Sequence, residues 1–515
     1  MKLKISRQFS FLTVKRALHF TGARSYDEYS NRRFFDIGEH PYQRVWSVMK
    51  HDYERTRKRL IRAKYDYYKR IGRMTVPIQK IYDIELIPVE CSIAIIGGGL
   101  AGSACAYWIK QRIRDDDMKL IVIESDSQLA NSTTLLAPGG LWQQFNNPEK
   151  VQMSLFTAEF LRNADEHLKI LDNELPPMKF TPMNALFLAC NEEAAARLSE
   201  ECRSQSEQGA KVSILAREEL KLRFPFLNVE DVVAGRLGSE NEGVFDNWQL
   251  LSALREKNVT LGVQYIKAKV TGFEWDWYSD RSYSFLPSDQ QWRYKRLRRV
   301  VVEPQYTDAA PRPIYATIFI NCAGAWSGEV AEMAGFGVGP ELLSVPFPIV
   351  PRKRYAFIFH CPDGPSLDMP YLFDPTGVWC RREGLGNLYM CGKNPVGNED
   401  PVDHSNLDVD YSFFDSQIWP VLAKRVPAFE KLKVKNAWAY YADVNEYDGN
   451  AIIGPHPFYR NYFHLGGFNG LNLQHALPAA RGIMEQILDG AYVSIDLRDF
   501  HLDRMLRGKR LTRDS

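Results

Sequence analysis

The sequence predicts an α/β fold with a Rossmann-like dinucleotide-binding domain, and three features of residues 92–124 predict it. The apolar run SIAII breaks directly into a glycine turn, Gly97-x-Gly99-x-x-Gly102. A helical stretch, SACAYWIKQRI, follows the turn, and a second apolar strand, KLIVIES, then reaches Glu124. Strand, glycine turn, helix and acidic strand tip in this order are typical of a dinucleotide site. A glycine-rich turn with a purely structural role is the alternative, but it leaves the spacing of glycines and acid unexplained.

Each glycine of the turn, and the acid that follows, has a mechanical reason. Gly97 allows the tight turn out of the strand, and Gly99 lets backbone amides approach a pyrophosphate. Gly102 lets the helix pack closely on the sheet, so its N-terminus points a partial positive charge at the phosphates. Glu124 can accept hydrogen bonds from ribose hydroxyls. The predicted pyrophosphate loop comprises Gly97, Gly98, Gly99, Leu100, Ala101 and Gly102.

Length and composition place the chain among ordinary globular proteins of two or three domains. It has 515 residues, of which 45% are hydrophobic and 25% charged, and this length exceeds one compact core. A net charge of +2 argues against a protein that mainly coats nucleic acid. The eight cysteines are scattered, without a CxxC pair or a His/Cys cluster. We therefore expect reduced thiols and no metal site, and no segment resembles a membrane span.

The N-terminal part of the chain is basic in two successive segments. Residues 1–26 carry six Lys or Arg, no acidic residue and an apolar counter-face. Such a leader is typical of mitochondrial import, with a disordered basic tail as the alternative. Residues 27–90 are predicted to form a helical extension, and within it the stretch 41–73 has eleven Lys or Arg against three acidic residues.

The sequence of this basic extension does not decide what the extension contacts. A solvated helix packed loosely on the body is the plainest interpretation, and contact with anionic lipid head groups or with a protein partner is the sharper one. Aromatic residues are interleaved with the basic ones, but no RNA-binding module accompanies them, so nucleic acid is not an expected partner.

Beyond Glu124 the chain continues with alternating strand and helix signals. SDSQLANSTTLLAPGG brings small hydroxylated residues and two glycines close behind the second strand, where the backbone could approach a flat ring. Residues 151–172 predict an amphipathic helix, YIKAKVTGFEW a strand, and TIFINCAGAWS a strand broken at Ala323-Gly324. HLGGFNGLNLQHALPAARGIMEQIL is a strand tip, a glycine turn and a helix, a second place where helix-end amides could meet a cofactor.

These segments, in this order, resemble the D-amino-acid oxidase-like family of FAD proteins. The motifs that carry the resemblance are GGGLAG (97–102), GG (139–140), ENEGVFD (240–246), NCAGAWS (321–327), DGNAIIGPHP (448–457) and GGFNG (466–470). The resemblance covers about residues 90–495 and implies a Rossmann-like FAD-binding domain with an inserted α+β substrate domain. The implied boundaries are 91–175, 231–345 and 436–495 for the FAD-binding domain, 176–230 and 346–435 for the substrate or cap domain, and 496–515 for a C-terminal tail.

Carried over position by position, the resemblance implies where each part of FAD would lie. The glycine loop would hold the pyrophosphate, and Glu124 the adenosine ribose. The residues implied to line the flavin are Ser132, Thr133, Gly139 and Gly140. Val270 would meet adenine through its backbone, and Ala323 and Gly324 would pass beneath the cofactor. The residues implied at the pyrimidine end of the ring are Gly467, Phe468, Asn469, Gly470 and Leu471, where helix amides would stabilise a reduced, anionic flavin.

Two departures from the family pattern bear on the chemistry. Family members with covalent FAD use a histidine in the segment that here reads NSTTLLAPGG, or a cysteine in the one that reads WAYYADVNEYDG. Neither is present, so non-covalent FAD is expected. The terminal turn, often G-[SN]-G-H-G in amine oxidisers, is GFNGLN here, and loss of the imidazole is expected to weaken turnover while leaving binding intact.

If catalysis is retained, the resemblance implies oxidation of a small amine with a carboxylate. Hydride leaves a C–H adjacent to a neutral amine, and an arginine fork would anchor the carboxylate. Arg354 and Arg381, beside alternating apolar strands, are the predicted anchors, and Tyr355 is the predicted hydroxyl donor.

Within the family the chain is similar to a mitochondrial branch of assembly factors for respiratory complex I. The segments that suggest this branch include LWQQF (141–145), RREGLGNLYMCG (381–392) and RVPAFEKLKVKNAW (425–438). The implied partners are complex I subunits or assembly intermediates, and the implied location is the matrix side, peripheral to the inner membrane. Two functions stay open: a FAD-bearing assembly factor, and an active dehydrogenase or oxidase of a secondary amine such as an N-methylated glycine.

Overall fold

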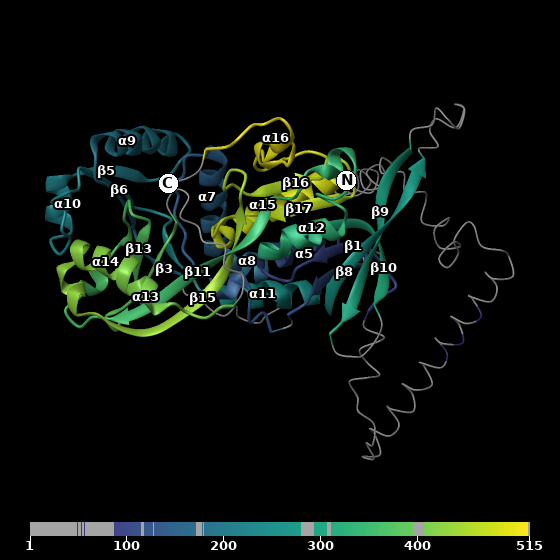
Figure 1. Cartoon of the computed structure of the whole chain (residues 1–515), viewed down its shortest axis with the longest axis horizontal. Coiled ribbons are helices and arrows are strands. Elements are labelled where there is room, and N and C mark those ends of the chain that lie inside the picture. The colour runs from purple at the N-terminus through teal and green to yellow at the C-terminus, as the bar shows by residue number, and fades with distance from the viewer. Residues whose placement is uncertain are drawn as a thin grey trace, which may run out of the picture.

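Two β-sheets organise the chain, with helices on their outer faces and between them (Figure 1). The computed structural model describes residues 87–512 except 115–117, 127, 171–177, 179, 280–292, 306–310 and 396–405, together with residues 49, 53 and 56. The predicted leader 1–26 lies outside the described residues, as does almost all of the predicted extension 27–90.

The first sheet has seven strands and contains the predicted dinucleotide fold. Its strands are β1 (Glu90–Ile96), β2 (Leu120–Glu124), β8 (Gln264–Ser279), β9 (Arg293–Pro304), β10 (Arg312–Asn321), β16 (Ile452–Pro455) and β17 (Tyr462–Gly466). A parallel core runs in the order β8-β2-β1-β10-β17, and β16 adds an antiparallel edge. β8 also pairs antiparallel with β9, which in turn reaches β10.

Alternating side chains of β1 supply two cores on the two faces of this sheet. Ile93 and Ile95 pack against four helices: α5 (Leu100–Arg112), α7 (Pro148–Arg162), α11 (Asn247–Thr260) and α15 (Asn472–Leu488). Ala94 and Ile96 pack on the opposite face, against the β8–β9 pair and α12 (Ser327–Met333). Because successive residues of a strand point to opposite faces, a strand that is apolar throughout is expected to be covered on both.

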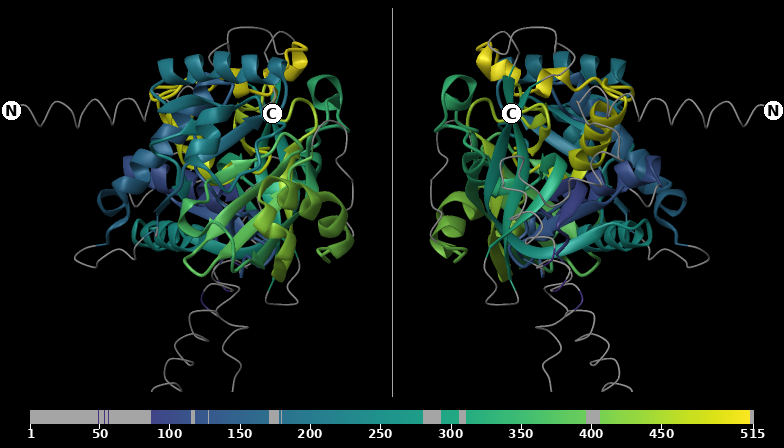
Figure 2. Two further views of the ribbon diagram at one scale, coloured as in Figure 1. Left: turned by 90° about the vertical axis from the view of Figure 1, so that its left-hand side faces the viewer. Right: turned by 90° about the vertical axis from the view of Figure 1, so that its right-hand side faces the viewer.

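The second sheet has eight strands and lies beside the first (Figures 1 and 2). Its strands, in spatial order, are β15 (Lys433–Asn445), β11 (Ile349–His360), β14 (Leu388–Lys393), β13 (Val378–Glu383), β12 (Tyr371–Phe373), β4 (Ala185–Ala189), β6 (Ala234–Gly238) and β5 (Val212–Ala216). The other α-helices and strands of the described residues are α6 (Thr133–Leu136), α8 (Ala164–Leu168), β3 (Thr181–Pro182), α9 (Glu192–Glu207), α10 (Arg217–Arg223), β7 (Gly243–Val244), α13 (Tyr411–Phe413), α14 (Trp419–Arg425) and α16 (Asp503–Leu506).

The eight-stranded sheet extends past the boundaries that were expected for the cap domain. β6 at Ala234–Gly238 and β15 at Lys433–Asn445 lie in this sheet, beyond 230 and 435. The physical reason is strand pairing: β6 joins β4 to β5, and β15 pairs with β11 over its length. Within the described residues, no helix combines the length and apolarity needed to cross a membrane.

Candidate functional site

The carboxyl ends of the parallel strands bring the predicted cofactor segments to one edge. β1 ends at Ile96, whose partners are Ile123 of β2 and Asn321 of β10. Asn321 is in turn paired with His464 of β17. Four predicted cofactor segments therefore follow strand positions that are aligned across the sheet: the glycine loop, Glu124, the 323–324 break and the 467–471 turn. Ligands of open α/β sheets bind at this edge.

Steric contacts explain the two outer glycines of the loop. Gly97 has φ +101°, and a Cβ there would lie 2.3 Å from the carbonyl oxygen of Cys322. A Cβ at Gly102 would lie 1.9 Å from the carbonyl oxygen of Gly97. Both distances are far below van der Waals contact, so only glycine lets α5 start this close to β1 and β10.

Glu124 and a threonine hold the centre of the loop. The Gly98 amide donates to Oε2 of Glu124 at 2.6 Å, and the Leu100 amide donates to Oγ1 of Thr134 at 3.1 Å. Burial raises the pKa of Glu124, while amide hydrogen bonds oppose the shift. Thr134 was not predicted as a site residue, although it completes the Ser132-Thr133-Thr134 run that was singled out.

The neighbouring predicted residues occupy three different settings. Ser132 and Thr133 stand at the start of α6, and the Thr133 hydroxyl donates to the Tyr441 carbonyl at 2.5 Å. Gly324, with φ +56°, has no atom within 4 Å of an added Cβ, so its side faces open space. Val270 is buried in β8 opposite Val302, which leaves its backbone, not its side chain, for any ligand contact.

Gly139 and Gly140 lie against the inner face of the eight-stranded sheet. The Tyr371 hydroxyl donates to the Gly139 carbonyl at 3.4 Å. A Cβ at Gly140 would lie 2.7 Å from the Trp142 ring and 2.8 Å from the Tyr371 ring. This sheet thus forms a roof over the segment that is predicted to line the flavin.

Strand register decides which predicted catalytic residues face the site. Arg381 is paired with Met390, Met390 with Ile358, and Arg354 lies four residues before Ile358 on β11. Both arginines therefore share the inner face. Tyr355 has the opposite parity and packs against Phe413, with ring centroids 5.3 Å apart, on the outer side. The prediction that Tyr355 supplies a hydroxyl to the site is corrected, and Tyr371 and Tyr440 are the tyrosines on the arginines' face.

Protein groups already engage the Arg381 guanidinium. It donates to the Pro138 carbonyl at 2.7 Å and to Glu383 at 2.6 Å, and it contacts Met390 Sδ at 3.4 Å. Arg354 donates to the Lys353 carbonyl at 3.0 Å. Both residues are buried. The Arg381 guanidinium, which was expected to bind a substrate carboxylate, thus connects the eight-stranded sheet to Pro138, the residue before Gly139.

A buried carboxylate controls the Gly467–Leu471 turn. The amides of Gly467 and Phe468 donate to Oδ2 of Asp443, at 2.9 and 3.0 Å. The Asn469 amide donates to the Asp443 carbonyl at 2.9 Å. Leu471 caps α15, and Gly470, with φ +88°, has open space where a Cβ would be. The turn amides that were expected to face the flavin are therefore shared with Asp443, a residue that sequence reasoning did not single out.

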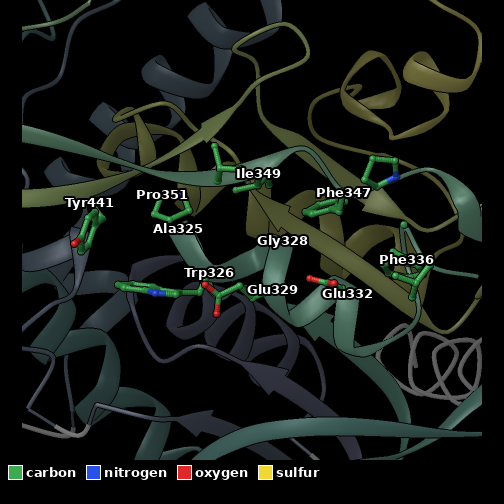
Figure 3. Close-up of a pocket in the computed structure, with 14 residues that line it drawn as sticks. Ala325, Trp326, Gly328, Glu329, Glu332, Phe336, Phe347, Ile349, Pro351 and Tyr441 are labelled. Atoms are coloured by element: carbon green, nitrogen blue, oxygen red, sulfur yellow. The ribbon is translucent and has the colours of Figure 1, made fainter. Parts of the chain in front are cut away.

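A cavity of ≈ 550 Å³ adjoins the 323–324 segment. Trp326, Glu329 and Glu332 lie on one side of it, and Tyr441, Pro351 and Ile349 on the other (Figure 3). It therefore lies between the segment that follows β10 and the strands β11 and β15 of the eight-stranded sheet. Among the described residues, no group of three or more His, Cys, Asp or Glu side chains could hold a metal ion.

Glu242, in the ENEGVFD motif, connects the eight-stranded sheet to the chain just after Gly140 by hydrogen bonds. It accepts hydrogen bonds from the amides of Ala185 and Gln143, at 2.8 and 3.3 Å, and from Nε2 of Gln144 at 3.2 Å. Burial raises the pKa of Glu242 to about 7, and these donors oppose the shift only in part.

The raised pKa predicts a pH-dependent stability. Because the folded-state pKa exceeds the unfolded value, the unfolded chain ionises first, and folding free energy is lost as pH rises from about 4.5 to 7. We compare the free energy of unfolding of Glu242→Gln with that of the wild type by urea unfolding at pH 5 and at pH 8. The variant's advantage in this free energy should be about 2 to 3 kcal/mol larger at pH 8 than at pH 5. Glu240→Gln, at an exposed position two residues away, is the matched control. An unchanged difference between the two pH values would refute the assignment.

The residues at the cofactor edge fit FAD. The loop leaves no room for side chains at Gly97 and Gly102, Glu124 stands at the strand tip, and open space lies beside Gly324 and Gly470. No histidine or cysteine occurs in the two segments that would carry a covalent link. FAD would be held by the 97–102 loop and Glu124 at its ADP half, and by 139–140 and 467–471 at its ring.

Comparisons with known proteins agree with this assignment. The family model for FAD dependent oxidoreductases matches residues 92–486. The chain is 41% identical over 434 residues to FAD-dependent oxidoreductase domain-containing protein 1 of Bos taurus, covering 84% of this chain and 88% of that protein. It is 25% identical to mitochondrial sarcosine dehydrogenase of Mus musculus, covering 81% of this chain and 42% of that protein.

A solved structure shows the same fold. L-proline dehydrogenase from P. horikoshii matches with a TM-score of 0.65 and 21% identity, covering 82% of this chain and 100% of that chain. Together with the family match over residues 92–486, the site geometry leads to one conclusion. This chain belongs to the FAD dependent oxidoreductase family, and its cofactor is FAD.

Proposed function

We propose that this protein acts in mitochondria, on the matrix side and peripheral to the inner membrane, where its FAD-loaded body supports assembly of respiratory complex I. Its partners in this proposal are complex I subunits or assembly intermediates, and the basic N-terminal extension provides contacts to them or to anionic lipid. The basic, acid-poor leader and the likeness to FAD-dependent oxidoreductase domain-containing protein 1 support the proposal.

The observation that carries the choice of a non-catalytic role is the state of the roof. Arg381 is held by Pro138, Glu383 and Met390. Aromatic rings fill the inner face around Gly140: Tyr371 and Phe373 lie 4.6 Å apart by their centroids, and Trp142 lies 5.5 Å from Tyr371. Substrate oxidation requires a vacant pocket with a free anchor over the ring. The engaged Arg381 and the aromatic packing around Gly140 therefore support a non-catalytic role.

FAD, when bound, supplies hydride-accepting chemistry. The chain's own residues exclude water from the ring face, through Trp142, Tyr371 and Phe373, and fix the roof through Arg381. FAD also stabilises the native state by mass action, since a ligand that binds only the folded chain favours folding. An assembly factor with such a site gains stability from the cofactor, whether or not it turns over a substrate.

Oxidation of a secondary amine is the second candidate. Two observations favour it: the similarity to sarcosine dehydrogenase and the position of Arg354 and Arg381 on the inner face. In that case Arg354 would anchor a small carboxylate, and a neutral amine would lie over the flavin.

A double variant separates the two functions. Cells without this protein should contain less assembled complex I, and a chain with Arg354→Ala and Arg381→Ala should restore it as the wild type does. Only the catalytic alternative requires these arginines to bind a carboxylate substrate, whereas assembly requires the folded body and its surface. Because Arg381 also donates to the Pro138 carbonyl and to Glu383, the variant is compared only where its fold is retained. Native gels quantify the assembled complex, and anaerobic absorbance spectra with N-methylated glycines quantify flavin reduction.

The double variant is informative when its FAD content and melting temperature match those of Arg382→Ala. Arg382 neighbours Arg381 on β13 and contacts the Gly384 carbonyl at the surface, so it is the matched control. A double variant that keeps FAD, loses an amine-dependent reduction seen in the wild type and fails to restore complex I would favour catalysis.

A further inference from the structure

Asp443 is a buried carboxylate with one oxygen committed to backbone amides and the other without a partner. It lies on β15 and is 1% exposed. Oδ2 accepts from Gly467 and Phe468, while Oδ1 has no hydrogen-bond partner among the described residues. Burial raises the pKa of Asp443 to about 6, with the backbone amides opposing the shift. At pH 8 the group is therefore ionised, and its charge is concentrated at the base of the turn.

The turn that Asp443 grips is the one assigned to the flavin. Amides at a helix N-terminus stabilise negative charge on a bound group, and α15 begins directly after Leu471. Here the first amides of the turn point at a carboxylate of the protein. Their positive potential is thereby offset, and a fixed negative charge is added in a water-poor region where charges act strongly.

We propose that Asp443 is a positioning residue that sets the Gly467–Gly470 turn against the flavin and, through its charge, holds the bound flavin in the oxidised state. The inference rests on the proposed FAD site. Two-electron reduction adds a hydride equivalent to the ring and leaves negative charge at its pyrimidine end. A neighbouring carboxylate disfavours that charge, so electrons from a reductant remain on the reductant.

The test compares purified holoproteins at pH 8 in redox equilibrium with a reference dye, with dithionite as the electron donor. Asp443→Asn keeps an oxygen that can accept from Gly467 and Phe468 but removes the charge. At a fixed ratio of reduced to oxidised dye, the Asp443→Asn substitution should raise the ratio of reduced to oxidised flavin about tenfold or more. FAD content and melting temperature should stay near those of the wild type, because the turn keeps its acceptor.

Glu485→Gln is the matched control. Glu485 is also a buried carboxylate that accepts from two successive amides, of Val493 and Ser494, at 2.8 and 3.0 Å. It lies near the opposite end of α15, roughly 20 Å along the helix from Asn472. Its neutralisation should leave the flavin ratio unchanged, which separates the effect of this one charge from that of removing any buried carboxylate.

The outcomes distinguish this inference from the FAD site itself. Asp443→Asn with retained FAD and an unchanged ratio would overturn the inference alone, and wild-type protein that binds no FAD would overturn both. If Asp443→Asn does not fold, Asp443→Ser keeps a hydroxyl acceptor without the charge, and the same rise in the ratio is expected. Asp443→Ala leaves two amides without an acceptor and should instead lose FAD.

Discussion

Leucine at position 99 should give a folded but colourless protein. A Cβ at Gly99 would lie 3.0 Å from Thr134 Oγ1, a tight contact that a small shift of this side chain can relieve, whereas at Gly97 and Gly102 it would meet backbone oxygens. The substitution therefore does not force the strand and helix apart. The longer side chain would instead lie across the surface of the loop that approaches the pyrophosphate. Purified Gly99→Leu protein should therefore lack flavin absorbance, while its circular dichroism spectrum stays close to that of the wild type.

Loss of FAD should also lower the stability of this variant. A ligand at 100 to 1,000 times its dissociation constant stabilises the native state by about 3 to 4 kcal/mol, and that contribution disappears with binding. Gly386→Leu is the control, because Gly386 is an exposed glycine with negative φ and no atom within 4 Å of an added Cβ. Flavin retained at wild-type levels in Gly99→Leu would place the pyrophosphate elsewhere.

Arg504→Leu should cause the largest loss of stability. Its guanidinium forms a two-point pair with Asp448, at 2.8 and 3.0 Å, and both side chains are buried. It also donates to the carbonyls of Phe500 and Asn450, at 2.8 and 3.1 Å. Removal of one partner leaves Asp448 as an uncompensated buried charge, which costs about 3 to 5 kcal/mol.

Urea unfolding of the holoprotein measures this effect. Arg507→Leu is the matched control, since Arg507 lies one turn further along, is 78% exposed and approaches Asp503 only to 3.9 Å. Its substitution should change the free energy of unfolding by less than about 1 kcal/mol. Equal effects of the two substitutions would show that the tail is not held by the Asp448 pair.

Short sequence segments were enough to predict the dinucleotide-binding fold. They did not predict contacts between segments that are distant in the sequence. The glycine turn, its flanking strand and helix, and Glu124 lie within 33 residues, and each has its own composition signal. The region predicted as a C-terminal tail is fastened to the body by Arg504 and Asp448, 56 residues apart. Nothing in either segment alone indicates that pairing.

Side-chain direction in β11 could not be predicted from its sequence for a related reason. PRKRYAFIFH has basic residues at successive positions and then apolar residues at successive positions, because the strand is covered on both faces. Without a two-residue alternation, Arg354 and Tyr355 cannot be assigned to faces. Asp443 escaped notice because the amides that it accepts, at 467 and 468, lie 24 and 25 residues further along.

The most direct test of a non-covalent FAD site is the fate of the flavin when purified wild-type protein is precipitated with acid. The contacts at 97–102 and Glu124, and the absence of His and Cys from the two linkage segments, predict a yellow protein that releases a stoichiometric amount of FAD to the supernatant. Flavin that stays with the denatured pellet, or a preparation that contains no FAD, would contradict this account.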